Sequence, residues 1–261
     1  MQEHIKTILV TGAYGHAGSK IVKGLIEKTN FRVLAAGRKA DKLESLKKMY
    51  PSDRLLTQVL DLDNKNDLSL CAQKADMVIN AVGPYSMGGI EIAKTILALK
   101  IPYIDLANEQ LHLNALREIR HEIEKSGSMI FTCAGQSPGV STLVMIHLAN
   151  LVTNVDNIEM YGVMGRLPTP DQTLGSIMSG ILEASMDSTT YVNGKHVHEK
   201  LGACIKEHTV PEPFGTVKML SCPLNDSILV PEAVRCNGVR TLFGLQMDIS
   251  PATFKIMAVL K

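Results

Sequence analysis

Three glycines near the start of the chain have the spacing of a phosphate-binding turn. The segment "ILVTGAYGHAGSKIVKGL" places Gly12, Gly15 and Gly18 between an apolar run and a helical pattern. Gly12 would allow a tight turn, Gly15 a close approach to a pyrophosphate, and Gly18 close packing of the helix on the strand. The N–H groups at the start of the helix favour a phosphate there. The spacing is G-x-x-G-x-x-G, not G-x-G-x-x-G, and the alternative is a purely structural turn. We predict dinucleotide binding, and the other cofactor residues predicted here are Tyr14, His16 and Ala17.

The next apolar run ends in "AAGRKADKLESL", which bears on the choice of dinucleotide. A site that prefers NAD places an acidic residue there to bind the ribose hydroxyls. Here the run is followed by Arg38 and Lys39, and an Arg presents a planar fork to phosphate oxygens. Asp41 could be this acidic residue, but Asp41 and Glu44 have the spacing of a helix capping box, which explains Asp41 better. We therefore predict NADP as the cofactor, with NAD as the alternative. For the two cations, the competing interpretation is a solvated surface pair.

Two further segments are predicted to line the cofactor. In "VLDLDN", Asp61 is a candidate for binding the adenine amino group beside Leu62, and Asp63 is expected to cap the next helix. The segment "NAVGPY" follows a buried strand, so it would pass the middle of the cofactor at the carboxyl edge of the sheet. Its predicted cofactor residues are Ala81, Val82, Gly83 and Pro84.

Polar residues after later strands are candidates for catalysis and substrate binding, because loops after strands hold site residues on a rigid scaffold. Tyr85 and Glu109 are the predicted catalytic residues; Tyr85 would orient substrate or pass a proton. Each candidate has a structural alternative. Tyr85 would only pack over the cofactor, Glu109 would cap a helix, and Arg166 would be a surface charge. The predicted substrate-binding residues are Asn108, Ser137 and Arg166.

Two other constellations are set aside. Tyr191 and Lys195 match the Tyr-x-x-x-Lys spacing of short-chain dehydrogenases, but Asn193-Gly194 between them predicts a hairpin, whereas the pair needs a helix. His196, His198 and Glu199 alternate as on a solvated strand face, and we predict no metal site.

The first half of the chain alternates between apolar strands and amphipathic helices. Near-continuous apolar strands separated by helices indicate a parallel sheet covered on both faces, and six units predict a doubly wound α/β fold. The expected strands are Thr7–Val10, Arg32–Ala36, Leu55–Leu60, Met77–Val82, Tyr103–Leu106 and Met129–Cys133. The expected helices are His16–Lys28, Asp41–Tyr50, Asn64–Lys74, Gly89–Leu99 and Gln110–Lys125.

This alternation ends after Pro138, and the second half is expected to be a smaller α+β domain. We predict a dinucleotide-binding domain over residues 1–135 and a substrate and dimerisation domain over residues 136–261. Elements expected in the second domain are a helix at Val140–Val152, a strand in "NIEMYGVMGR", a helix near Ser176–Met186, a hairpin at Asn193-Gly194, and extended runs at Thr216–Leu220, Arg240–Met247 and Phe254–Leu260.

Composition argues against several other classes of protein. The chain has 261 residues, a net charge of +1 and 4% aromatic residues, which favours neither nucleic acid nor membrane as a partner. Five cysteines without a C-x-x-C pair indicate reduced thiols, and no signal peptide is recognised, so we expect a cytoplasmic protein. The charge-free stretch 126–155 contains only one continuous helical run, Val140–Val152, which is too short to span a bilayer.

Five segments in this order resemble the saccharopine dehydrogenase-like NAD(P)-binding oxidoreductases. They are "TGAYGHAG", "AGRKADKL", "NAVGPY", "YIDLANE" and "CAGQSPGVSTLV", and "LGSIMSGILEA" continues the likeness. The resemblance implies a Rossmann domain, an inserted α+β domain and hydride transfer at a carbon–nitrogen bond. Relative to the family, the chain is expected to be shortened or incomplete at its C-terminus.

From this resemblance we expect an NADP-dependent oxidoreductase that reduces an imine derived from an amino acid or polyamine. Two alternatives stay open: a non-catalytic NADPH sensor, and a carbonyl or enoyl reductase. The expected partners are a small-molecule substrate and a second copy of the chain, because the run "TLFGLQMDI" has few acidic or basic residues and suggests a sheet surface that pairs.

Overall fold

The computed structural model describes residues 6–164 and 188–245, which form two compact units. Unit 1 contains the described residues up to Ala107 together with Leu111–Ala134. Unit 2 contains Asn108–Gln110 and the described residues from Gly135 on. The predicted boundary after residue 135 lies one residue beyond the end of unit 1. The return of a three-residue segment to unit 2 was not predicted.

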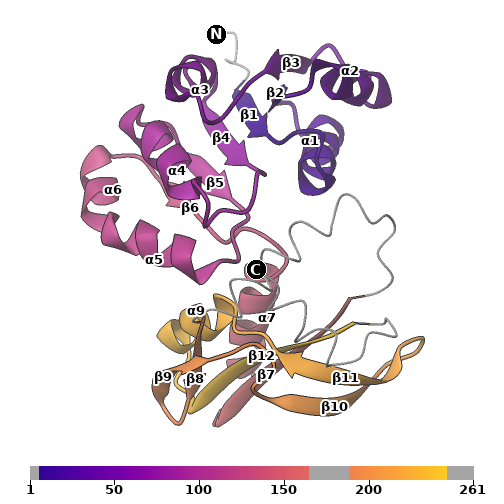
Figure 1. Ribbon diagram of the computed structural model, residues 1–261, viewed down its shortest axis with the longest axis vertical. Helices are drawn as coiled ribbons and strands as arrows, with labels where there is room; N and C mark the ends of the chain where they lie inside the picture. Colours follow the sequence, from indigo (N-terminus) through magenta and orange to yellow (C-terminus); the bar gives the residue numbers. More distant parts are fainter. Residues whose placement is uncertain (1–5, 165–187, 246–261) are drawn as a thin grey trace. The chain divides into compact units, whose positions relative to one another are not determined.

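Unit 1 is built on a six-stranded parallel sheet with the order β3-β2-β1-β4-β5-β6. This arrangement confirms the predicted doubly wound α/β fold (Figure 1). The strands are β1 (Thr7–Thr11), β2 (Arg32–Gly37), β3 (Leu55–Val59), β4 (Met77–Asn80), β5 (Tyr103–Asp105) and β6 (Ile130–Phe131). The helices are α1 (His16–Lys28), α2 (Ala40–Met49), α3 (Lys65–Ala72), α4 (Gly89–Ala98), α5 (Gln110–Glu118, whose first residue belongs to unit 2) and α6 (Arg120–Ser126).

Both faces of this sheet are buried, which explains why its central strands are mostly apolar. Val10 and Val33 point to one face and pack against Val22 of α1 and residues of α2. Leu9 and Leu34 point to the other face, where residues of α3 and α4 cover them. Successive side chains of a strand alternate between faces, so a strand buried on both sides favours apolar residues at consecutive positions.

Three local features of unit 1 differ from the sequence-based expectation. The single helix expected at Gln110–Lys125 is divided into α5 and α6 around Ile119, which lies outside both helices as the N-cap of α6. α2 begins at Ala40 with Lys39 as its N-cap, so Asp41 lies inside the first turn and the predicted capping box is wrong. Asn64, not Asp63, caps α3, and its side chain accepts hydrogen bonds from the backbone N–H groups of residues 66 and 67.

Unit 2 contains a separate six-stranded sheet with the order β10-β11-β12-β8-β9, and β7 pairs in parallel with β12. Its strands are β7 (Asn157–Met164), β8 (Ser188–Val192), β9 (Lys195–Glu199), β10 (Ile205–Val210), β11 (Gly215–Ser221) and β12 (Gly238–Leu245). Its helices in the described residues are α7 (Val140–Ala149) and α9 (Asp226–Ala233). The second part of the predicted fold, an α+β domain, is therefore confirmed (Figure 1).

The helices of unit 2 pack on β7 and β12. Met145 of α7 and Val230 of α9 contact Val239 of β12 in one core. The predicted hairpin is present between β8 and β9, where Asn193 and Gly194 both have positive φ, 52° and 73°. α9 was not predicted because it contains a proline. The segments expected at Ser176–Met186 and Phe254–Leu260 lie outside the described residues.

Among the described residues, no helix has both the length and the apolar character needed to cross a membrane.

Candidate functional site

The glycine-rich turn between β1 and α1 has the close backbone approach predicted from its sequence. Gly12 adopts a φ of +67°, a region that residues with a side chain rarely occupy. A Cβ atom on Gly12 would lie 2.7 Å from Cγ2 of Val82 and 2.9 Å from the carbonyl oxygen of Ala81. The turn after β1 therefore lies directly against the turn after β4, and only glycine fits there.

The start of α1 has backbone N–H groups without a side-chain cap. A Cβ atom on Gly18 would lie 2.1 Å from the carbonyl oxygen of Gly12, so the helix packs on the turn itself. Gly15 is the N-cap; its own N–H donates to Gly12, and no side chain caps the helix. The first N–H groups of a helix have no partner within the helix. Those of His16, Ala17 and Gly18 are consequently the donors that a phosphate would find at this end of α1.

Tyr14 joins this turn to the one after β2. Its hydroxyl oxygen accepts a hydrogen bond from the backbone N–H of Lys39 at 3.2 Å. Its ring lies against Gly37, where a Cβ atom would be 2.4 Å from Cε1 of Tyr14. Arg38 and Lys39 are exposed at this carboxyl edge of the sheet. The hydrogen bond between Tyr14 and the backbone of Lys39 thus joins the turn after β1 to the turn that carries Arg38 and Lys39.

The other predicted cofactor residues follow the neighbouring strands. Asp61 is exposed after β3, and its Oδ1 accepts a hydrogen bond from the backbone N–H of Asp63 at 3.3 Å. Leu62 is partly buried against the core of unit 1. Residues 81–84 follow β4, where the backbone N–H of Ala81 donates to the carbonyl of Thr11. Asp61, Leu62 and residues 81–84 therefore lie on turns that leave the carboxyl ends of β3 and β4.

Asn80, the last residue of β4, joins three strands through one buried side chain. Its Oδ1 accepts hydrogen bonds from the Thr11 hydroxyl at 2.7 Å and from the backbone N–H of Val82 at 3.1 Å. Its Nδ2 donates to the Tyr103 hydroxyl at 3.0 Å. Burial raises the pKa of Tyr103 above its ordinary value, so this phenol stays protonated. Asn80 fixes the start of the 81–84 turn.

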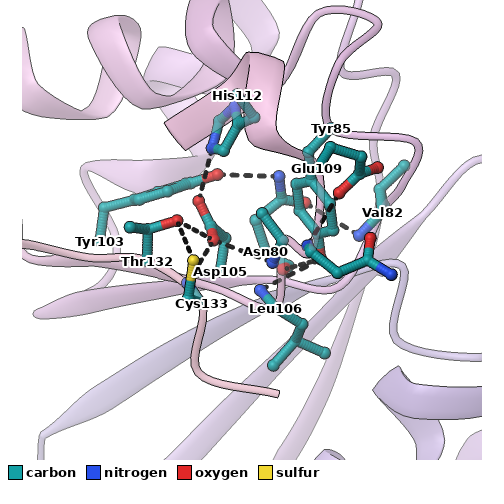
Figure 2. A network of polar contacts seen from close by, with 12 residues as sticks. Asn80, Val82, Tyr85, Tyr103, Asp105, Leu106, Glu109, His112, Thr132 and Cys133 are labelled. Atoms are coloured by element: carbon teal, nitrogen blue, oxygen red, sulfur yellow. Dashed lines mark hydrogen bonds and ion pairs between the residues drawn. The ribbon is translucent and has the colours of Figure 1, made fainter. Parts of the chain in front are cut away.

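Asp105, the last residue of β5, lies at the centre of a second set of contacts (Figure 2). Its Oδ1 accepts hydrogen bonds from the Thr132 hydroxyl at 2.7 Å and from the backbone N–H groups of Ala107 at 3.1 Å and Cys133 at 3.3 Å. Its Oδ2 lies 2.8 Å from Nε2 of His112. The carboxylate and the imidazole are both fully buried. Asp105 thus connects the chain after β5, the chain after β6 and α5.

The protein families and structures that resemble this chain agree with its fold. Residues 8–131 match the model of the saccharopine dehydrogenase NADP binding domain. The first domain of the chain is therefore similar to the NADP binding domain of saccharopine dehydrogenases. This result confirms the resemblance predicted from the sequence, and it supports the predicted NADP cofactor and oxidoreductase class.

Individual relatives cover more of the chain. A lipid droplet localized protein of Caenorhabditis elegans is 28% identical over 230 residues, which are 83% of this chain and 52% of that protein. Saccharopine dehydrogenase (L-Glu forming) from Saccharomyces cerevisiae has a similar fold with a TM-score of 0.66 at 21% identity, over 91% of this chain and 54% of that one. Biliverdin reductase from Synechocystis, solved with biliverdin and NADP+, gives a TM-score of 0.51 at 13% identity, over 94% of this chain and 73% of that one. The chain spans about half the length of the first two relatives.

In this saccharopine dehydrogenase-like chain, Tyr85 has an interior position. Its side chain is 7% exposed, and its hydroxyl donates to the carbonyl oxygen of Asn80 at 2.9 Å. The backbone N–H of Leu106 lies 3.4 Å from the same hydroxyl. The phenol therefore links the end of β4 to the chain after β5 through hydrogen bonds (Figure 2). This geometry gives the Tyr85 hydroxyl a structural role, and proton transfer and packing over the cofactor stay predictions for this residue.

The remaining substrate and catalytic candidates belong to unit 2. The Glu109 carboxylate accepts a hydrogen bond from the backbone N–H of Asn108 at 2.9 Å, and Glu109 is 4% exposed. The Ser137 hydroxyl donates to Oδ2 of Asp226 at 3.2 Å. Arg166 lies outside the described residues. The structure thus groups Asn108, Glu109 and Ser137 in one unit and the cofactor turns in the other.

The structure also describes the two groups of residues that the sequence analysis set aside, the Tyr191 and Lys195 pair and the possible metal ligands. Tyr191 pairs with His196 and Val192 with Lys195 across the β8–β9 hairpin, so Tyr191 and Lys195 do not share a helix. Within residues 6–164 and 188–245, no group of three His, Cys, Asp or Glu side chains could hold a metal ion.

Sequence reasoning missed Asn80, Asp105 and His112. A signal for the first two exists in the sequence, because each is the polar last residue of an otherwise apolar strand, "MVIN" and "YID". His112 gives no such signal, since its partner is set by the packing of α5 on the sheet.

Proposed function

We propose that this chain is an NADPH-dependent oxidoreductase that reduces a carbon–nitrogen double bond in an imine derived from an amino acid or a polyamine. The observation that carries the proposal is the match of residues 8–131 to an NADP binding domain, together with the glycine turn beside Arg38 and Lys39. NADPH would supply the hydride, while the chain would supply its orientation. The start of α1 would hold the pyrophosphate, and Arg38 and Lys39 would hold the 2′-phosphate.

The cofactor part of the proposal is tested by titrating NADPH and NADH against the wild-type chain and two variants. Arg38→Ala should reduce the preference for NADPH by roughly ten- to a hundredfold, the worth of a charge-assisted hydrogen bond. Arg32→Ala is the matched control, because Arg32 is an exposed arginine at the opposite end of the same strand. Equal affinities of the wild-type chain for the two dinucleotides would contradict the proposal.

The reaction is tested by following NADPH oxidation with imines formed from amino acids or polyamines and simple carbonyl compounds. Oxidation that depends on both the amine and the carbonyl component supports imine reduction. Oxidation with the carbonyl compound alone would favour a carbonyl reductase. Tight NADPH binding without oxidation in any mixture would favour the sensor alternative. Asn108 and Ser137 are proposed to contact substrate, Glu109 is proposed as a catalytic residue, and Arg166 is proposed to bind a substrate carboxylate.

We also propose a cytoplasmic location and a two-fold dimer, which is the commonest closed assembly. The relative from C. elegans is named for lipid droplets, so a fluorescent fusion should be examined in cells with and without induced droplets. Of the run that suggested a pairing surface, residues 241–245 lie in β12, where Leu242 is fully buried, and the rest lies outside the described residues. The apolar character of Leu242 is therefore explained within unit 2. Light scattering at micromolar concentration tests the dimer directly.

A further inference from the structure

Arg38, one of the two residues proposed to hold a 2′-phosphate, lies between two residues that both contact Tyr14. On one side is Gly37, the last residue of β2, where a Cβ atom would lie only 2.4 Å from Cε1 of the Tyr14 ring. On the other side is Lys39, the N-cap of α2, whose backbone N–H donates to the Tyr14 hydroxyl at 3.2 Å. One side chain from the glycine-rich turn therefore contacts the backbone before and after Arg38.

The contact with Tyr14 also explains why position 37 is a glycine. Gly37 lies in a strand and is not among the glycines with positive φ, so its backbone torsions do not require glycine. The Tyr14 ring instead occupies the space that a Cβ atom would need. The sequence thus combines a tyrosine in the first turn with a glycine at the end of β2, and the two residues fit each other.

Further hydrogen bonds fix the chain beside these contacts. The backbone N–H of Ala13, next to Tyr14, donates to the carbonyl oxygen of Ala36 at 3.1 Å, and the carbonyl oxygen of Lys39 accepts the N–H of Leu43 in α2 at 3.2 Å. Tyr14 itself is partly buried against the apolar core that α1 and α2 form with the sheet. The fold of unit 1 therefore sets the position of the Tyr14 side chain.

The side chains around Tyr14 carry positive charge. Arg38 and Lys39 are exposed, and Nζ of Lys42 lies 5.7 Å from the centre of the Tyr14 ring, within the range of a cation–π contact. NADPH differs from NADH only by the phosphate on the ribose that is bound at the end of the second strand. Because NADH has no group for these cations to bind, the placement of Arg38 matters for NADPH alone.

We propose that Tyr14 is a positioning residue that sets the preference for NADPH by fixing the backbone on both sides of Arg38. An arginine binds phosphate through a planar fork, so its contribution depends on orientation as well as on charge. A backbone that is already fixed leaves less freedom to be lost when the cofactor binds. The inference rests on the proposed NADPH-dependent function, and it assigns Tyr14 an effect through Arg38 rather than a contact of its own with the cofactor.

The variant Tyr14→Phe tests this inference, because it keeps the ring against Gly37 and removes only the hydrogen bond to Lys39. Exchange of the Lys39 amide, measured by NMR without cofactor, should become faster by roughly three- to tenfold, the worth of one hydrogen bond. NADPH affinity should fall by a similar factor, whereas NADH affinity should stay close to that of the wild-type chain. Tyr50→Phe is the matched control, since Tyr50 packs against the same core at the other end of α2, and it should leave all three measurements unchanged.

A double-mutant cycle distinguishes positioning from direct contact. Arg38→Ala alone should weaken NADPH binding by roughly ten- to a hundredfold. If Tyr14 acts through Arg38, Tyr14→Phe should have a clearly smaller effect in the Arg38→Ala background than in the wild-type chain. Effects of the same size in both backgrounds would overturn the inference, and so would an equal loss of NADPH and NADH affinity in Tyr14→Phe.

The same titrations separate this inference from the proposed function. Equal affinities of the wild-type chain for NADPH and NADH would overturn both. A wild-type preference for NADPH that Tyr14→Phe leaves unchanged, despite faster exchange at Lys39, would overturn the role of Tyr14 alone and leave the proposed cofactor intact. Unchanged exchange at Lys39 would also overturn this role, because the hydrogen bond would then contribute nothing to the turn.

Discussion

Nε2 of His112 lies 2.8 Å from Oδ2 of Asp105, and neither side chain is exposed to solvent. The pair connects α5 to the end of β5, and the other carboxylate oxygen of Asp105 holds the backbone after β5 and after β6. A buried group with this many partners is costly to remove, because its partners would remain buried without an acceptor.

Asp105→Ala should therefore destabilise the chain strongly. Each buried donor left without its acceptor costs about 1–3 kcal/mol, and the total is measured as the loss in the free energy of unfolding in urea. Asp61→Ala is the control, since Asp61 is an exposed aspartate at the end of β3 and its loss should cost within about 0.5 kcal/mol. Similar losses in the two variants would show that the Asp105 contacts contribute little.

Two glycines of α1 offer a matched test of the anion site. Gly18→Ala would place a Cβ atom 2.1 Å from the Gly12 carbonyl oxygen and force the helix away from the turn. NADPH affinity should fall by at least about tenfold, as expected when a charge-assisted contact is lost. Gly24 lies in the same helix, and a Cβ atom there would have no atom within 4 Å. Gly24→Ala should therefore keep the affinity for NADPH and stabilise the chain by roughly 0.5–1 kcal/mol. Unchanged NADPH titrations in Gly18→Ala would exclude α1 as the phosphate site.

The variant Tyr85→Phe distinguishes a structural role of the Tyr85 hydroxyl from a catalytic role. The lost hydroxyl donates to the Asn80 carbonyl, so the variant should lose about 1 kcal/mol of stability. NADPH affinity and turnover should remain within a few-fold of the wild type, once a substrate is available. A fall in turnover of roughly 10²- to 10⁴-fold would instead restore the proton-transfer role.

We expect Tyr161 of unit 2 to make the stability of the chain depend on pH in the alkaline range. Burial, together with a hydrogen bond from its hydroxyl to Glu159, raises the pKa of Tyr161 from 10.0 to about 12. A group whose pKa is raised by folding stabilises the folded state below its unfolded pKa and loses this contribution as the pH rises through the folded value. The wild-type chain should lose stability between pH 10 and about 12 more steeply than Tyr161→Phe. Denaturant unfolding across this range checks the prediction, and parallel losses would contradict it.

The sequence predicted those elements whose signal is local. The strands of unit 1 follow from apolar residues at consecutive positions, as at Leu9 and Val10, because both faces of the sheet are buried. The β8–β9 hairpin follows from Asn193-Gly194, where both residues need positive φ. β10 was missed because "IKEHTV" alternates exposed and partly buried residues without a strong apolar run.

Those parts of the candidate site that depend only on local backbone geometry, as at Gly12 and Gly18, could be predicted from the sequence. Those parts where distant side chains meet could not be predicted. Thr11 and Asn80 are 69 residues apart in the chain, and Ser137 and Asp226 are 89 apart. Such pairs depend on which strands and helices become neighbours, so no short segment encodes them.

The attachment of Asn108–Gln110 to unit 2 also has a consequence for synthesis of the chain on the ribosome. Glu109 and Asn225 are separated by 116 residues, so the segment emerges long before the side chain that holds it. At typical translation rates this delay is on the order of ten seconds. The parallel sheet of unit 1 is complete in sequence by residue 131, and it can form during the delay with the start of α5 still unattached. In that order of events, Asn108–Gln110 binds to unit 2 only after unit 1 has folded. The folding of unit 2 is then completed late, after its last residues have left the ribosome.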